Sequence, residues 1–152
     1  MHELRKSSLM LSLGVSLLIL TGFTPKGYLT SEARSGAQAI THHVALLRSS
    51  NPQEKAAAAY WLGQQRSAAA KAVDPLIELL GDSTQVDPAR YRSKTALQKM
   101  TVGEEAAAAL VNIGRASIEP LIHVLKNSPE PEARKNAAWA LGALHDTGAT
   151  QI

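Results

Sequence analysis

The side chains that most often carry catalysis or bind metals are few in this sequence, and they do not cluster. There is no cysteine, and the adjacent His42 and His43 point to different faces of a helix. Neither has a histidine or a carboxylate four residues further on, which is the helical spacing of a metal-binding pair. No nucleophile elbow and no glycine-rich phosphate loop is present, although the composition alone does not exclude a Ser-His-Asp arrangement. We therefore predict no catalytic residue, no cofactor and no metal.

A group of residues suited to binding lies between residues 83 and 102. The basic side chains and the tyrosine among them are Arg90, Tyr91, Arg92, Lys94 and Lys99. Asp87 is the single acid in this segment. Such a segment can bind an acidic protein, an anionic lipid surface or a nucleic acid. The alternative is a solvated segment that covers the core. We predict that these five residues contact an acidic partner.

Two further aromatic residues stand at equivalent positions. Tyr60 and Trp139 each precede a glycine by three residues, and Val111 occupies the same position in a third segment. Equivalent positions on successive helices form a stripe along a repeat array. Two interpretations remain open: an aromatic strip that contacts a partner protein, or packing between neighbouring repeats.

Composition limits the class of protein. The chain has 152 residues, of which 45% are hydrophobic, so it can bury a core and is not disordered throughout. Its net charge is +3, and aromatic residues make up only 4%. This balance is too weakly basic for a nucleic-acid-binding protein. The absence of cysteine excludes disulfides and thiolate zinc sites.

Residues 1–33 differ from the rest of the chain. Arg5 and Lys6 precede an uncharged, largely apolar stretch over residues 7–23. A basic start followed by an apolar run is typical of a secretory signal or a membrane anchor, and it places the remainder outside the cytoplasm. The alternative is a buried core helix in a cytosolic protein. We predict a signal or anchor helix plus linker over residues 1–33, membrane association through residues 7–23, and a separate domain over residues 34–152.

Two sequence patterns alternate along that domain. The first ends in a glycine and has Ala five residues before it and Leu or Ile one before it, at Gly63, Gly114 and Gly142. Those two apolar positions are four apart and share one helix face. The second pattern has the form Pro-Leu-Ile-x-x-Leu, beginning at Pro75 and Pro120, with a weaker copy over residues 39–47. We call the first an A helix and the second a B helix, in the order B-A-B-A-B-A.

The spacing of the glycines locates an insertion. Gly114 and Gly142 are 28 residues apart, whereas Gly63 and Gly114 are 51 apart. Most of the excess falls between a B helix and the following A helix, at about residues 83–102. We refer to this segment as the insertion, and we expect no β-strand in the domain.

Local signals agree with paired helices. Pro75 and Pro120 suit a first helical turn, and Asn51 before Pro52 is a helix start. The three pattern glycines are expected at left-handed C-caps. We also expect seven Leu and Ile residues at the repeated core positions to be buried. These positions are Leu62, Ile113, Leu141, Leu76, Leu121 and their neighbours Ile77 and Ile122.

The Ala-Ala-x-x-Leu-Gly and Pro-Leu-Ile-x-x-Leu motifs resemble the short HEAT-like repeats of the phycobilisome (PBS) lyase type, over residues 38–149. The resemblance implies an all-α solenoid of antiparallel helix pairs. Terminal repeats normally need a polar cap, so an open, apolar C-terminal repeat predicts self-association. Such proteins include chromophore lyases, hydroxylases and non-catalytic scaffolds. The di-iron hydroxylases carry His-Glu pairs on their helices, whereas here His2-Glu3 lies in the leader. The favoured function is a non-catalytic protein-binding scaffold, exported or membrane-anchored; the alternative is a lyase-like or hydroxylase-like enzyme or its accessory subunit.

Overall fold

The structure is a computed structural model that describes residues 31–92 and 98–149. The chain divides into two units, residues 1–34 and 35–152, and the account below concerns the second. The predicted signal or anchor helix over residues 7–23 lies outside the described residues. Within the described ranges, no helix combines the length and the apolar character that crossing a membrane requires.

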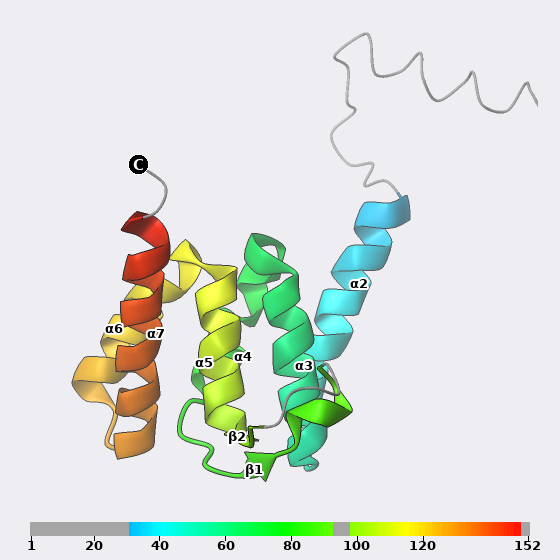
Figure 1. Ribbon diagram of the computed structural model, residues 1–152. Coiled ribbons are helices and arrows are strands. Elements are labelled where there is room, and N and C mark those ends of the chain that lie inside the picture. The colour runs from blue at the N-terminus through cyan, green and yellow to red at the C-terminus, as the bar shows by residue number, and fades with distance from the viewer. Residues whose placement is uncertain (1–30, 93–97, 150–152) are drawn as a thin grey trace, which may run out of the picture. The chain divides into compact units, whose positions relative to one another are not determined.

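Helices of the two predicted kinds alternate along the described chain. The B helices are α2 (Ser31–Leu46), α4 (Val73–Ile77) and α6 (Ile118–Asn127), and the A helices are α3 (Pro52–Gln64), α5 (Val102–Ile113) and α7 (Pro131–Ala149). Short 3-10 turns, η1 (Arg66–Ala72) and η3 (Arg115–Ser117), lead into α4 and α6. Helix α3 packs on α5 and α5 on α7, with α4 and α6 against them (Figure 1). The helical repeat fold and the order of its elements are thus confirmed.

The predicted helix starts are also confirmed. Asn51 caps α3, because its side chain accepts a hydrogen bond from the Gln53 amide. Pro75 lies in the first turn of α4 and Pro120 in the first turn of α6, where a missing N–H costs no hydrogen bond. Helix α5 starts with a capping box in which the side chains of Thr101 and Glu104 each bind the other residue's backbone N–H.

The core is built from leucine and alanine. Leu62, Leu76 and Leu121 are fully buried, as the repeat alignment predicts. Ile113 is buried as predicted, whereas Ile77, Ile122 and Leu141 are only half-buried, so the prediction is wrong for these three. A solenoid buries the face that each helix turns to its neighbours, and a position beside that face is covered only in part.

Two of the three predicted glycine C-caps are wrong. Gly63 lies inside α3 and Gly142 inside α7, and neither has a positive φ. Gly114 does follow α5 with a φ of +89°, but its ψ of −138° is not left-handed helical. At Gly63 the glycine serves close helix packing, because its α-carbon faces the backbone of Ala109 in α5.

The insertion contains a small sheet, contrary to the expectation that no strand forms. Strands β1 (Gln85–Val86) and β2 (Met100–Thr101) pair antiparallel, and a 3-10 turn, η2 (Pro88–Arg90), follows β1. The ribbon lies at one end of the helices, next to the start of α5 (Figure 1). Strands of two residues are too short to leave an alternating pattern in the sequence.

Candidate functional site

A pocket of about 620 Å³ opens between the insertion, the start of α5 and the outer side of α7. Its insertion wall is formed by Pro88, Arg92, Gln98, Lys99 and Met100. Glu104 of α5 and Lys135, Asn136 and Trp139 of α7 form the rest. Two parts of the chain distant in sequence, the insertion with the start of α5 and helix α7, therefore converge on one concavity, which is the candidate binding site.

Trp139 is the most exposed large apolar side chain of the pocket. It is 55% exposed, although tryptophan is among the residues with most to gain from burial. Its repeat equivalent Tyr60 is better covered and is half-buried. The Tyr91 ring lies 5.9 Å from the Tyr60 ring, centre to centre, and Arg92 covers the Tyr60 ring. The two aromatics of the predicted strip thus differ: Tyr60 has neighbours from the insertion, and Trp139 faces the open pocket.

A buried ion pair fastens the insertion to α5. The Glu105 side chain is 1% exposed, and the guanidinium of Arg92 donates to both its oxygens, Nη2 to Oε1 at 2.5 Å and Nε to Oε2 at 3.1 Å. Burial alone would lower the pKa of Arg92, but hydrogen bonding to Glu105 and the charge of that carboxylate raise it. Arg92 therefore stays charged, and its planar group is held at a fixed orientation.

Two tyrosines complete this cluster. The Tyr91 hydroxyl donates to Glu105 Oε2 at 2.8 Å, and the Arg92 guanidinium lies 4.9 Å from the centre of the Tyr60 ring. Burial, and then the Glu105 carboxylate, raise the pKa of Tyr91 far above its ordinary value, because ionised Tyr91 would place two negative charges together. We call Tyr60, Tyr91, Arg92 and Glu105 the latch.

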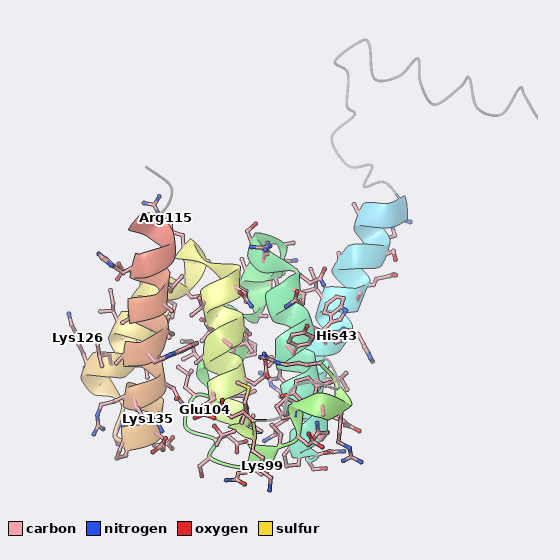
Figure 2. All side chains as sticks on the ribbon, viewed as in Figure 1. His43, Lys99, Glu104, Arg115, Lys126 and Lys135 are labelled. Carbon is pink, nitrogen blue, oxygen red and sulfur yellow. The ribbon has the colours of Figure 1, made fainter. Side chains whose placement is uncertain are left out.

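Most of the charges around the pocket have internal partners. Glu104 accepts the Thr101 amide in the capping box, and Lys135 pairs with Glu132 on the surface of α7. The hydrogen bond from Lys135 to Glu132 raises the Lys135 pKa. Lys99 is exposed and pairs with no acid in the described ranges. Figure 2 shows Lys99, Glu104 and Lys135 at the same end of the helices, with Arg115 at the opposite end.

The predicted site residues fall into separate places. Arg92, Lys99 and Trp139 line the pocket. Tyr60 and Tyr91 lie behind Arg92 in the latch, and Arg90 is exposed at the end of η2. Lys94 lies outside the described residues.

Sequence reasoning missed several members of the site. Glu105 was overlooked because an acid in the first turn of a helix usually faces solvent and offsets the helix dipole. Its repeat equivalents are the exposed Glu54 and the buried Ala133, which signals that this position is buried in part of the array. Met100 and Pro88 carried no signal, since single apolar residues in a loop have no periodicity.

The histidines form no metal site within the described residues. No group of three metal-ligating side chains comes together in residues 31–92 and 98–149. His43 is half-buried, and its ring stacks on Trp61 with centres 3.8 Å apart. Its Nδ1 lies 2.9 Å from the Ala39 carbonyl oxygen. These contacts join α2 to α3.

Comparison with protein families agrees with this architecture. The family model "PBS lyase HEAT-like repeat" matches residues 54–82 and again 102–127, and "Armadillo/beta-catenin-like repeat" matches residues 116–144. The first two ranges begin in α3 and at α5, and the insertion falls in the gap between them. No curated protein matched the chain. The chain is a HEAT-like repeat protein.

Proposed function

We propose that this protein is a non-catalytic binding module that holds a partner protein in the pocket between the insertion and α7. The observation that carries the proposal is Trp139, which is 55% exposed on the wall of a concave site in a helical repeat fold. Tryptophan is enriched among the residues that dominate binding energy at protein interfaces. Helical repeat domains of this type commonly mediate protein–protein interaction, which supports the same conclusion.

The surroundings of Trp139 suit a partner side chain. Met100 adds apolar surface, and its flexible thioether adapts to different shapes. Lys99 on the pocket wall is exposed and basic, which favours an acidic partner, and the exposed Arg90 at the end of η2 adds positive charge to the insertion. Lys94 belongs to the same proposal on the basis of sequence alone.

The proposed binding is tested by capturing partners from extracts of the source organism. Trp139→Ala should lose the captured protein while its circular dichroism spectrum stays unchanged, because an exposed residue contributes little to folding. Leu125→Ala is the matched control, since Leu125 is the other large exposed apolar side chain of the described domain. Equal recovery by wild type and Trp139→Ala would refute a role for the pocket.

The proposed location is outside the cytoplasm, by export or by anchoring through residues 7–23. The support is the sequence alone, in which Arg5 and Lys6 precede an uncharged run. Cell fractionation with a C-terminal tag tests it. Soluble cytoplasmic protein with an intact N-terminus would refute the proposal.

A second contact surface is proposed on α7. Ala59 and Gly63 of α3 are buried, whereas their equivalents Ala138 and Gly142 of α7 are exposed. This small-residue face resembles the one that α3 turns to α5, which favours self-association through the C-terminal repeat. Light scattering across a concentration series tests it: a dimer that Gly142→Lys dissociates is expected. A wild-type monomer at every concentration would refute it.

The enzymatic alternative rests on the family resemblance alone. A lyase-like or hydroxylase-like activity, or a role as the accessory subunit of such an enzyme, predicts that the purified protein carries a chromophore or iron. Absorbance and metal analysis test this directly.

A further inference from the structure

We propose that Arg92 makes the pocket specific for a carboxylate, so that the ligand is a peptide segment with an Asp or Glu beside an apolar side chain. The carboxylate binds the outer edge of Arg92, and the apolar side chain lies against Trp139. This inference rests on the proposed function and adds the chemistry of the partner.

Arg92 is positioned as a recognition residue by the latch. Glu105 takes two of its five N–H groups, Nε–H and one on Nη2, and Tyr60 supports the flat face of the guanidinium. In the described part of the chain, these are the only acceptor contacts of the guanidinium. The Arg92 side chain is 29% exposed and also lines the pocket. A preorganised arginine binds a carboxylate with less loss of side-chain entropy than a free one.

The latch is specific to the repeat that carries the insertion. A fully buried acid in an alanine-rich helix is costly, and a buried pair often contributes little net stability compared with apolar residues. In α7 the equivalent position is a buried alanine, Ala133, so the repeat packs without an acid here. We infer that Glu105 acts as a positioning residue, through Arg92, for ligand binding.

The acids described at the pocket and its edge do not compete with the ligand carboxylate for the outer edge of Arg92. Glu104 and Glu105 are bonded internally, and Glu132 pairs with Lys135. The pocket has three cations, Arg92, Lys99 and Lys135, and three acids lie on it or at its edge. Of these cations, only Lys99 pairs with no acid among the described residues. Such a site favours a single negative charge over a doubly charged phosphate, because each further charge meets the field of the three acids.

The apolar half of the site lies within reach of the same ligand. Trp139 and Met100 line the pocket together with Arg92, so one short peptide spans both. Residues two apart in an extended peptide point to the same side and are about 7 Å apart, which is the scale of a pocket of this volume. An acidic residue two positions from an apolar one is the simplest occupant.

The test is selection from a library of random short peptides displayed on phage, with the purified protein as bait. Wild-type protein should enrich peptides with Asp or Glu two positions from Leu, Met, Phe or Trp. A synthetic selected peptide should bind about tenfold weaker when its acid is changed to the amide, and a phosphoserine in place of the acid should not restore binding.

Variants separate the two halves of the site. Trp139→Ala should abolish selection. Arg92→Lys keeps a positive charge beside Glu105 but loses the planar guanidinium with its fixed N–H donors. This variant should lose the preference for an acid over an amide and should still select peptides with an apolar side chain. The double variant Arg92→Met, Glu105→Gln removes both charges and should also lose the preference for an acid. It replaces Arg92→Lys in the test if that variant does not fold. Arg115→Ala, at the opposite end of the helices, is the control.

The outcomes distinguish this inference from the proposed function. Peptides that require Trp139 but carry no acid, or that bind Arg92→Lys as well as wild type, overturn the role of Arg92 and leave the binding module standing. Preference for phosphoserine over carboxylate also overturns it. No enrichment by wild-type protein, or enrichment that Trp139→Ala retains, overturns both.

Discussion

Gly63 of α3 lies so close to Ala109 of α5 that a Cβ on the glycine would stand 2.9 Å from the Ala109 Cα. The contact is between backbones, so no side-chain rotation relieves it. In α7 the equivalent glycine, Gly142, has open space where its Cβ would be. The two glycines share a sequence motif but not a packing environment.

Alanine at these two glycines should therefore have opposite effects on stability. Gly63→Ala pushes α3 away from α5 and should lower the free energy of unfolding by about 1–3 kcal/mol, as overpacking does. Gly142→Ala improves helix propensity in α7 without a clash and should stabilise by about 0.5–1 kcal/mol. Urea unfolding of both variants measures the difference. Equal effects would contradict the helix packing described here.

The equivalent leucines Leu80 and Leu125 should differ in the same way. Leu80 is 0% exposed, whereas Leu125 is 39% exposed. Leu80→Ala should cost about 2–5 kcal/mol, because it removes buried methyl groups and leaves a cavity. Leu125→Ala should change the free energy of unfolding by no more than about 0.5 kcal/mol. Thermal and urea unfolding provide the comparison, and a large loss at Leu125 would show that it is covered in solution.

The repeat order was predictable from sequence because its signals are local. Pro75 and Pro120 mark helix starts wherever they stand, and Leu62 and Leu76 lie on faces set by helical periodicity. Exposure was not predictable in the same way. Leu125 has the sequence context of Leu80, but burial depends on whether another helix lies beside it.

The site was predictable only in part, for a related reason. The charge of Arg92 and Lys99 singled out the insertion, and Trp139 stood out by its size. The bond between Arg92 and Glu105 joins residues 13 apart in sequence, and no periodic sequence pattern relates the two positions. The latch, and with it the orientation of Arg92, therefore emerged only from the fold.

Ser117→Ala should be neutral or stabilising. The Ser117 side chain is fully buried, and its Oγ has no hydrogen-bond partner within the described residues. Its repeat equivalent is the fully buried Ala72, so alanine fits this position in the same architecture. Removing an unpaired buried hydroxyl avoids a desolvation cost of about 1–3 kcal/mol. A clear loss of stability in urea unfolding would show that the hydroxyl is paired in solution.

Tyr91 should make the fold sensitive to alkali. Its folded-state pKa is raised above the ordinary value of 10.0, so the folded protein keeps the proton that the unfolded chain releases. The stability from Tyr91 is complete below pH 10.0 and is lost as the pH rises toward the raised value. Tyr91→Phe should flatten this alkaline decline in urea unfolding, at a cost of about 0.5–1.5 kcal/mol near neutral pH. Tyr60→Phe, in the same cluster, is the control. An unchanged decline in Tyr91→Phe would assign the alkaline sensitivity to another group.

Breaking the latch from one side should cost more than removing it whole. Arg92→Met leaves the carboxylate of Glu105 buried without its cation, and Glu105→Leu leaves Arg92 without its anion. The loss should be larger for Arg92→Met, because Glu105 is 1% exposed whereas Arg92 is 29% exposed and regains water. For Arg92→Met we expect a loss of stability near the lower end of the ~3–5 kcal/mol found for buried pairs.

The double variant Arg92→Met, Glu105→Leu should recover most of that loss, since no unpaired charge remains. A double-mutant cycle by urea unfolding measures the coupling. Additive losses would show that the two residues act separately, and that the insertion is held on α5 by contacts other than this ion pair.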